Sequence, residues 1–525
     1  MINPQYDFFF TIKNSYSNTY INMSDKQLEK KGDTQTENGD VGFSLSSHAD
    51  RFLKYFVKLM RHFELDTDEL EELWELNPGM ILKIYLNARD CRSGKGEKRV
   101  FIDFLLWLRE YDFTIYQKLL PSVVKYGCWK DLLKVLDEKP CDTDNAPELK
   151  LFASQLKRDW KTIQKKQDKS ITLCAKWAPS EGKYFDKNIL TTDRGIMITL
   201  AKMLFPRSHR NQLAKLYRKR ISRLRKHINL VETKMCDNEW SDINYSCVPS
   251  QAHHRYKKAF RLNDEDGYEK YLDDVSNGEA KINTTGLHPH VLVRTYINGC
   301  QLDKTVELQW ETIIQKLQES KTFERTLAVV DVSGSMNGEP MTVAITLGLI
   351  ISQLTTGPFK QNCITFSAEP TFHRITGDSL YENVNNMTGM DWGYNTNLRA
   401  VFDQILTRAV ENNMDPDELP TRLFIFTDMQ FDVAEETPWE STYEYIVKKY
   451  SDAGYIMPKI IFWNLRSKIE SFPTTGTTPN VAMMSGFSPD LLKQVLSGEE
   501  YNPISNMLEI LSPYNVDDII NKPKD

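Results

Sequence analysis

The chain has 525 residues and a formal net charge of −6 at pH 7, and 40% of its residues are hydrophobic. This length exceeds what one hydrophobic core usually holds, so we expect at least two folded domains. The small net charge points to no class of partner. The eight cysteines include no Cys-x-x-Cys pair, which argues against a zinc ribbon or a disulfide framework and favours a reducing compartment.

No segment is typical of secretion or of membrane insertion. Met1 to Tyr20 is polar and aromatic, with Phe8 to Phe10 as its apolar cluster, which is too short for a signal-peptide core. A run of about 18 apolar residues is also lacking. We therefore expect an intracellular, cytoplasmic protein without a membrane partner, and a nuclear location stays open.

The first half of the chain has the pattern of helices. Residues 1–45 are rich in Asn, Ser, Thr, Gly and Lys, and their lack of periodicity predicts a flexible arm. Residues 46–319 are predicted to form an α-helical array, because apolar residues such as Phe52, Phe56 and Met60 recur at three-to-four spacing. Helical patterns cover residues 68–88, 116–137, 147–166, 193–204, 210–235 and 305–318. Helices in such succession favour a solenoid, although the sequence has no clean repeat period.

After residue 320, predicted strands and helices alternate, which favours a doubly wound α/β domain over residues 320–498. Strands are predicted at 326–331, 362–367, 371–375, 421–427 and 459–464, and helices at 339–354, 397–412, 441–452 and 488–496. Residues 499–525 are predicted to form a C-terminal helical extension that packs back on the helical array. The expected fold class is therefore α plus α/β.

Oxygen-bearing side chains follow two of these strands. Asp331, Ser333 and Ser335 come directly after the apolar run that ends at residue 330, and Asp428 ends a second apolar strand. Thr396 lies in a loop just before a helical pattern. Ligands of open α/β sheets bind outside the carboxyl ends of the strands, and Mg²⁺ and Mn²⁺ prefer oxygen ligands of this kind. The five residues therefore predict a site for one divalent cation.

The Asp-x-Ser-x-Ser loop, with one separated Thr and one separated Asp, resembles the metal-ion-dependent adhesion site (MIDAS) of von Willebrand factor type A domains. The resemblance implies a Rossmann-like domain with one Mg²⁺ or Mn²⁺ ion. Ser333, Ser335 and Thr396 would bind the ion through their hydroxyls, and Asp331 and Asp428 would reach it directly or through water. A Glu or Asp of a protein partner would fill the open coordination position. The alternative is a strand-capping turn, since Ser and Asp are ordinary turn residues.

Strings in the helical region extend the resemblance. Residues 87–97, 126–133, 175–181 and 248–250, with the Asp-Val-Ser-Gly-Ser-Met loop, are similar to a family of uncharacterised proteins. These proteins pair a helical N-terminal region with a C-terminal von Willebrand A domain. The layout is also similar, more distantly, to the Ro autoantigen and other TROVE-type proteins, which bind structured or misfolded RNA. Asn397 stands where the close family has Asp, and this loss of negative charge predicts weaker metal binding.

A basic segment is the second candidate site. Residues 207–226 contain nine Lys or Arg residues, and no Asp or Glu occurs between Asp193 and Glu232. An apolar seam at helical spacing predicts one buried face and one cationic face. Contact with RNA phosphates is the functional interpretation, helped by a second basic stretch at 157–169. The alternative is a solvated face that pairs with acidic neighbours. The residues expected on the RNA-binding surface are Arg218, Lys219, Arg223, Arg225 and Lys226.

Two other motifs are interpreted as structural. Residues 93–98, Ser-Gly-Lys-Gly-Glu-Lys, lack the spacing and the preceding strand of a phosphate loop, which favours an interhelical turn. His253, His254, His288 and His290 have no Cys pair to complete a zinc site, which favours a turn with ordinary histidines.

These observations predict a non-enzymatic protein with a metal-dependent interaction domain and a helical domain for binding a protein or a structured RNA. A pure protein-protein scaffold is one alternative. A metal-dependent hydrolase is another, but phosphatases of the haloacid dehalogenase type carry a second Asp two residues after the nucleophilic one. Ser333 occupies that position here.

Overall fold

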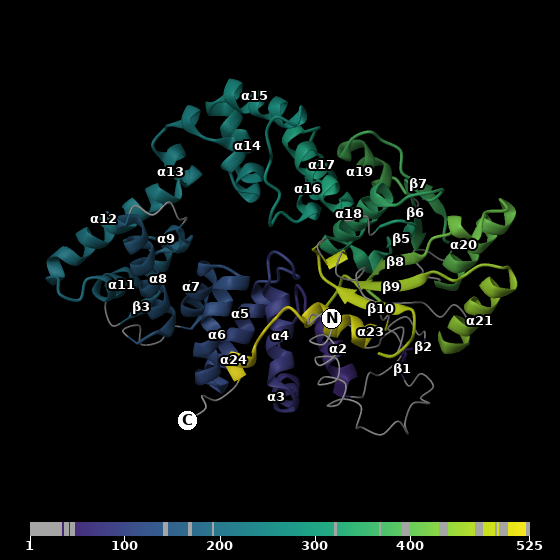
Figure 1. Cartoon of the computed structure of the whole chain (residues 1–525), viewed down its shortest axis with the longest axis horizontal. Helices are drawn as coiled ribbons and strands as arrows, with labels where there is room; N and C mark the ends of the chain where they lie inside the picture. Colours follow the sequence, from purple (N-terminus) through teal and green to yellow (C-terminus); the bar gives the residue numbers. More distant parts are fainter. Residues whose placement is uncertain are drawn as a thin grey trace, which may run out of the picture.

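The computed structural model describes residues 34–35, 41–42, 48–139, 145–165, 171–191, 194–319, 323–366, 369–390, 398–429, 439–467, 476–488, 491–492 and 502–520. The chain is mostly helical, and its C-terminal half contains a six-stranded, mostly parallel sheet (Figure 1). The predicted arm, residues 1–45, lies outside the described residues except for the paired strands β1 (Thr34–Gln35) and β2 (Val41–Gly42).

The helical half forms an arc in Figure 1, and both of its ends meet the α/β half. At one end α2 packs on β10, and at the other end α16 and α17 pack on α18. The helices of the arc are α2 (His48–Lys58), α3 (Thr67–Leu76), α4 (Pro78–Arg89), α5 (Arg99–Tyr111), α6 (Phe113–Tyr126), α7 (Trp129–Glu138), α8 (Pro147–Gln164), α9 (Cys174–Trp177), α10 (Tyr184–Asn188), α11 (Ile196–Leu204), α12 (Arg210–Ile228), α13 (Val231–Cys236), α14 (Ser250–Asn263), α15 (Glu265–Ser276), α16 (Pro289–Ile297) and α17 (Lys304–Gln318). Two short strands, β3 (Leu190–Thr191) and β4 (Arg194–Gly195), pair before α11.

Three segments that the periodicity predicted as single helices are each two helices. In 68–88 the chain breaks at Asn77, whose side chain caps α4 by accepting a hydrogen bond from Met80 N at 2.9 Å. In 116–137 the break is at the extended Cys128. In 210–235 it is at Asn229, which has a left-handed φ of 55°. Hydrophobic spacing continues across such breaks, because successive helices bury the same side, so periodicity alone does not reveal them.

The sheet is parallel except at one edge. Its strands are β5 (Thr326–Asp331), β6 (Asn362–Phe366), β7 (Phe372–Arg374), β8 (Arg422–Thr427), β9 (Lys459–Asn464) and β10 (Val481–Ser485). They lie in the order β10-β9-β8-β5-β6-β7, and β7 is antiparallel to β6. The edge strand β10 was not predicted, because Val-Ala-Met-Met-Ser has neither a β-branched run nor alternation.

Helices cover both faces of the sheet. They are α18 (Glu339–Leu354), α19 (Leu380–Thr388), α20 (Leu398–Glu411) and α21 (Trp439–Asp452). The β5-to-β6 and β8-to-β9 crossovers run in opposite directions along the sheet, and right-handed crossovers then place α18 and α21 on opposite faces. Leu327, Val329, Phe424 and Phe426 are all 0% exposed, as continuous apolar strands covered on both faces require. Most of the helix predicted at 488–496 lies outside the described residues.

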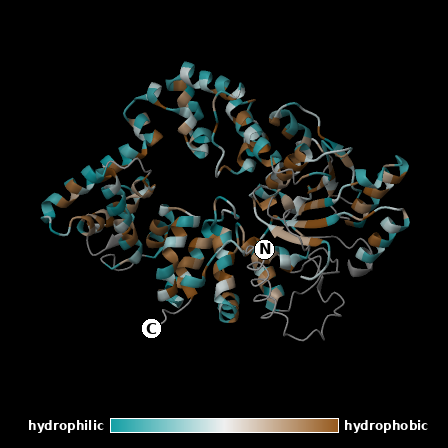
Figure 2. Ribbon diagram, in the orientation of Figure 1, coloured by the Kyte–Doolittle hydropathy of each residue, from teal (hydrophilic) through white to brown (hydrophobic). Residues whose placement is uncertain are grey.

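The two halves share one hydrophobic core. A continuous cluster of buried side chains runs from α2 through the sheet to the C-terminal helices α23 (Pro503–Leu511) and α24 (Asp517–Ile520). Figure 2 shows this pattern as hydrophobic strands flanked by helices with one hydrophobic side. The C-terminal extension packs back on the arc, since α23 contacts α2 and α24 contacts α6. Within the described residues, no helix combines the length and apolar character needed to cross a bilayer.

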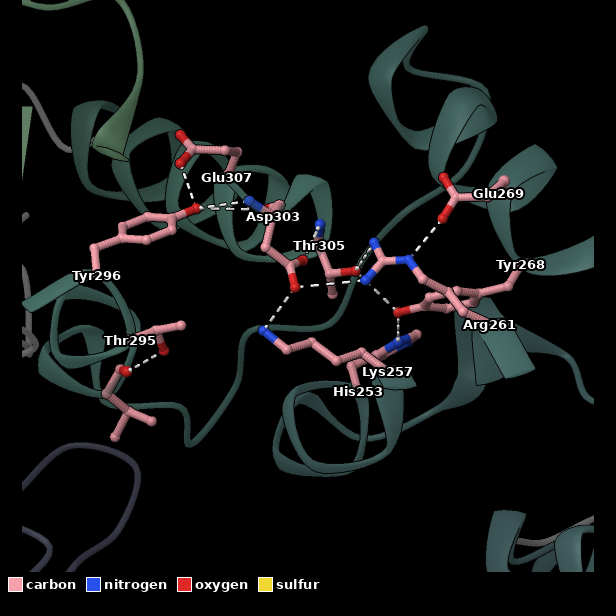
Figure 3. A network of polar contacts seen from close by, with 11 residues as sticks. His253, Lys257, Arg261, Tyr268, Glu269, Thr295, Tyr296, Asp303, Thr305 and Glu307 are labelled. Carbon is pink, nitrogen blue, oxygen red and sulfur yellow. Dashed lines mark hydrogen bonds and ion pairs between the residues drawn. The ribbon is translucent and has the colours of Figure 1, made fainter. Parts of the chain in front are cut away.

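A polar network joins the helices at the top of the arc (Figure 3). Lys257 and Arg261 of α14 both reach Asp303 Oδ2, at 3.0 and 3.4 Å. Burial opposes ionisation of Asp303, but these two cations outweigh it and hold its pKa below the usual value. Tyr268 Oη of α15 lies 3.2 Å from Thr305 Oγ1 of α17. Around this network lies a second, smaller core, so this part of the arc is held largely by its own contacts.

Two buried histidines predict how stability depends on pH. Burial lowers the pKa of His253 to about 4 and that of His290 to about 3. Both values lie below the pKa of about 6.5 in an unfolded chain. Below about pH 6.5 the unfolded chain takes up protons that the folded histidines do not. The free energy of unfolding is therefore highest above that pH and falls as the pH drops toward the folded-state pKa values. At pH 5 each histidine should lower the free energy of unfolding by about 2 kcal/mol.

Urea unfolding at pH 7 and pH 5 of the wild type, His253→Gln and His290→Gln measures this effect. Each variant should lose about 2 kcal/mol less than the wild type between the two pH values. Equal losses in all three proteins would show that these histidines do not carry the pH dependence.

Candidate metal centre

Four of the five predicted metal ligands lie at one point of the sheet. Asp331 is the last residue of β5, and Asp428 directly follows β8. These neighbouring strands are where the strand order reverses, because β5 continues to β6 on one side and β8 to β9 on the other. Crevices at such reversals hold ligands in open α/β sheets. Ser333 and Ser335 lie in the turn between β5 and α18.

Hydrogen bonds order this turn and the Asp331 carboxylate. Asp331 Oδ1 accepts a hydrogen bond from Ser333 N at 2.9 Å, and Oδ2 accepts one from the Thr427 hydroxyl at 2.7 Å. The hydroxyls of Ser333 and Ser335 lie 3.0 Å apart. Thr427 was not predicted as part of the site, although its position at the end of β8 was a signal. The arrangement presents two hydroxyls beside a fixed carboxylate.

The two carboxylates are desolvated neighbours. Asp331 is 0% and Asp428 1% exposed. Burial and the adjacent Asp428 raise the pKa of Asp331 to about 6. Arg466 Nη1 lies 3.4 Å from Asp428 Oδ2. Two buried carboxylates side by side favour protonation of one of them or a nearby cation, and carboxylate and hydroxyl oxygens are the kind of ligand that Mg²⁺ and Mn²⁺ prefer.

The remaining predicted ligand, Thr396, lies outside the described residues together with Asn397, so both predictions about this loop stay predictions. The described chain resumes at Leu398, where α20 begins. Among the described residues, no three His, Cys, Asp or Glu side chains gather in a metal-binding arrangement. The predicted site contains only two such residues, because its other ligands are hydroxyls.

Helix α18 begins next to this turn and is tied to both ends of the arc. Glu339, in its first turn, accepts hydrogen bonds from Arg61, which follows α2, and from Arg294 of α16. Burial opposes ionisation of Glu339, but these two hydrogen bonds outweigh it and lower its pKa to about 2. The ion pairs were not predicted, because charged residues this far apart in sequence give no local signal.

The segment 93–98 also lies at this junction. It connects α4 to α5, as the prediction of an interhelical turn required. Lys95 is 1% exposed, and its ammonium donates hydrogen bonds to Leu59 O at 3.1 Å, to Ser485 Oγ at 2.6 Å and to Phe56 O. Burial lowers its pKa to about 7. Lys95 therefore joins the end of α2 to the carboxyl end of β10.

Comparisons with known proteins agree with this division of the chain. Residues 36–148 and 149–323 match the domain of unknown function DUF2828, and residues 325–517 match the domain of unknown function DUF7788. The chain belongs to the DUF2828 family. An uncharacterized protein of Acanthamoeba polyphaga mimivirus is 38% identical over 514 residues, which cover 91% of this chain and 87% of that protein. The two matches meet directly before β5, where the DUF2828 arc passes into the sheet.

The basic segment of the DUF2828 part lies on α12. Tyr217, Ile221 and Leu224 are buried, as the predicted apolar seam requires. The guanidinium of Arg220 lies between two rings, with its carbon 4.9 Å from the centre of Trp160 and 4.1 Å from that of Phe205. Arginine packed on aromatic rings in this way keeps its charge at the surface.

The predicted RNA-binding residues fall into three groups. Lys219, Arg223 and Lys226 are exposed, and no carboxylate among the described residues pairs with them. Arg218 forms an ion pair with Glu181 at 3.3 Å. The guanidinium of Arg225 is already engaged within the chain, because it donates to Ala175 O, Ala178 O and Ser180 Oγ, so Arg225 is left out of the proposed surface. Arg225 therefore holds α12 against the 175–180 segment.

Three of the four histidines lie on helices of the DUF2828 arc, so the prediction of a turn is wrong for these three. His253 and His254 belong to α14, and His290 lies in the first turn of α16, where Pro289 is the first helical residue. A proline fits that position because its missing N–H would have no helical partner. His288 directly precedes the same helix, and its side chain makes no capping hydrogen bond. From the sequence alone, the start of a helix could not be distinguished from a turn at these positions.

Proposed function

We propose that this protein is a non-enzymatic binding protein whose α/β half holds one Mg²⁺ or Mn²⁺ in a MIDAS-like site of von Willebrand A type. The observation that carries the proposal is the burial of Asp331 and Asp428 at neighbouring strand ends, beside the hydroxyls of Ser333 and Ser335. Thr396 completes the proposed ligand set.

The proposed centre is a docking device. Hydroxyl ligands bring no charge, so an ion held mainly by them keeps enough positive charge to attract a further anion. Bound at this edge, Mg²⁺ or Mn²⁺ would supply a Lewis-acidic position for the Glu or Asp of a protein partner. Ser333 stands two residues after Asp331, where haloacid-dehalogenase-type chemistry needs a second Asp, and this supports binding rather than hydrolysis.

Calorimetric titration of the chelator-treated full chain with Mn²⁺ tests this proposal. The proposal requires saturable binding of one ion per chain, and capture of an acidic peptide that depends on the metal and is reversed by chelator. Absence of any saturable heat with Mn²⁺ or Mg²⁺ would rule out the metal centre.

A second binding function is proposed for α12, namely sequence-independent contact with structured RNA. The combination of exposed Lys219, Arg223 and Lys226 with Arg220 packed on Trp160 supports it. Cationic side chains neutralise phosphates and release counter-ions, so binding through this surface depends strongly on salt. RNA is proposed over DNA because the layout predicted from the sequence resembles that of TROVE-type proteins.

The triple variant Lys219→Glu, Arg223→Glu and Lys226→Glu is expected to weaken binding of every RNA sequence tested. Phosphate contacts position a strand without reading its bases. Each lost contact should reduce the slope of log affinity against log salt by about 0.7 to 0.9, so three lost contacts give a change of about 2 to 3. Filter binding of a hairpin RNA at several salt concentrations measures this slope.

The matched control reverses the charge of three exposed lysines elsewhere, Lys258, Lys281 and Lys448. This control has the same change in net charge and should retain the slope of the wild type. An equal loss in both triple variants, or no RNA retention by the wild type at low salt, would contradict an RNA surface on α12.

A further inference from the structure

Arg466 lies next to the proposed metal centre, and the sequence predicts no role for it. It follows β9, its side chain is 44% exposed, and its Nη1 lies 3.4 Å from Oδ2 of the buried Asp428. That distance is long for a charge-assisted hydrogen bond, which is usually about 2.7 to 2.9 Å. The guanidinium is therefore close enough to neutralise Asp428 but only loosely attached to it.

The backbone of Arg466 is fixed much more firmly than its side chain. Asn464 Oδ1 accepts a hydrogen bond from Arg466 N at 2.9 Å, and Asn464 Nδ2 donates to Arg466 O at 2.5 Å. Asn464 is 0% exposed, and its Nδ2 also lies 3.3 Å from Val57 O, on α2 of the arc. One buried amide therefore connects α2 to the position of Arg466.

A divalent ion at Asp331 and Asp428 would meet the positive charge of Arg466 a few ångströms away. The two cations repel each other, and both need the Asp428 carboxylate. Because the arginine side chain is long and half exposed, it can turn into water without breaking the bonds that hold its backbone. The geometry thus places at Asp428 an internal cation that an external ion could replace.

We propose that Arg466 is the internal counter-ion of the metal centre: it occupies Asp428 in the metal-free protein, is displaced when Mg²⁺ or Mn²⁺ binds, and so sets the affinity for the metal. This inference rests on the proposed metal centre. Arg466 acts on the ion through Asp428, and Asn464 keeps it in place from α2. The affinity for the metal is therefore coupled to the contact between the arc and the sheet.

Titration of the full chain with Mn²⁺ at low and high salt tests the inference. Arg466→Gln should bind Mn²⁺ about tenfold more tightly than the wild type at low salt, because one unit of nearby positive charge is removed. Arg466→Lys should restore the weaker binding. The gain should shrink at high salt, which screens a charge that is partly exposed. A purely structural role for Arg466 would give neither the salt dependence nor the rescue by lysine.

Arg374→Gln removes an exposed arginine from β7 at the far edge of the sheet and should leave the affinity unchanged. If the wild type and all variants fail to bind Mn²⁺, the metal centre itself is wrong. If the wild type binds Mn²⁺ but Arg466→Gln binds it equally or less tightly, the proposed role of Arg466 is wrong, while the proposed metal centre is supported.

Discussion

Replacing Asp331 with alanine is expected to reduce the affinity for Mg²⁺ and Mn²⁺ by at least about a hundredfold, because the loss of a ligand exceeds the effect of losing its supporting hydrogen bonds. Asp331 is the one carboxylate held by both the Ser333 amide and the Thr427 hydroxyl. The fold should remain, since β5 is buried by apolar neighbours on both faces. Calorimetric titration with Mn²⁺ measures the loss.

Asp378→Ala is the matched control for this experiment. Asp378 is an exposed aspartate that precedes α19 in the same half of the chain, so the variant should keep the affinity of the wild type. Far-ultraviolet circular dichroism of both variants should match the wild type. Undiminished metal binding by Asp331→Ala would show that the ion, if bound, lies elsewhere.

The second large effect concerns the sheet that carries the site. Phe424→Ala is expected to lower the free energy of unfolding by about 3 to 5 kcal/mol, as for other emptied aromatic positions in a core. Phe424 is 0% exposed, and its ring centre lies 5.9 Å from that of Phe426 and 6.3 Å from that of Trp463. Urea unfolding followed by tryptophan fluorescence gives the change.

The control for this variant is Phe113→Ala on α6. Phe113 is 48% exposed, so its removal should cost less than about 1 kcal/mol. Similar losses for the two variants would mean that the sheet does not form the stable part of the core.

The central strands, and the strand ends that form the candidate site, were predictable because local sequence determines them. Strands buried on both faces appear as continuous apolar runs, as in β5 and β8. Ligands gather at the carboxyl ends of such strands, and this rule predicts from the sequence that Asp331 and Asp428 lie close together. The edge strand β10 has no such run, so it was recognised only in the structure.

The junction around the site was not predictable, because its partners are distant in sequence. Arg61, Arg294 and Glu339 are each typical of a solvated surface when read alone. Only the closure of the arc on the sheet brings them together. Lys95 shows the same limit, since nothing local to residues 93–98 indicates that its ammonium reaches Ser485.

The basic helix shows where charge counting fails. Helical spacing places Arg225 beside Leu224 at the edge of the buried seam, but its acceptors belong to residues 175–180, about 45 to 50 positions earlier in the chain. Buried carbonyl groups leave no compositional signal. Lys219, Arg223 and Lys226, on the open side of the helix, were predicted as exposed cations and are exposed.

The most direct test of the metal centre is an anomalous difference map from crystals of the full chain grown with Mn²⁺. The proposal predicts one manganese peak beside the hydroxyls of Ser333 and Ser335, between β5 and β8, with Asp331 and Asp428 within reach directly or through water. A well-ordered turn with Asp331 still bonded to Thr427 and no peak beside it, or a manganese peak only at other residues, would contradict it.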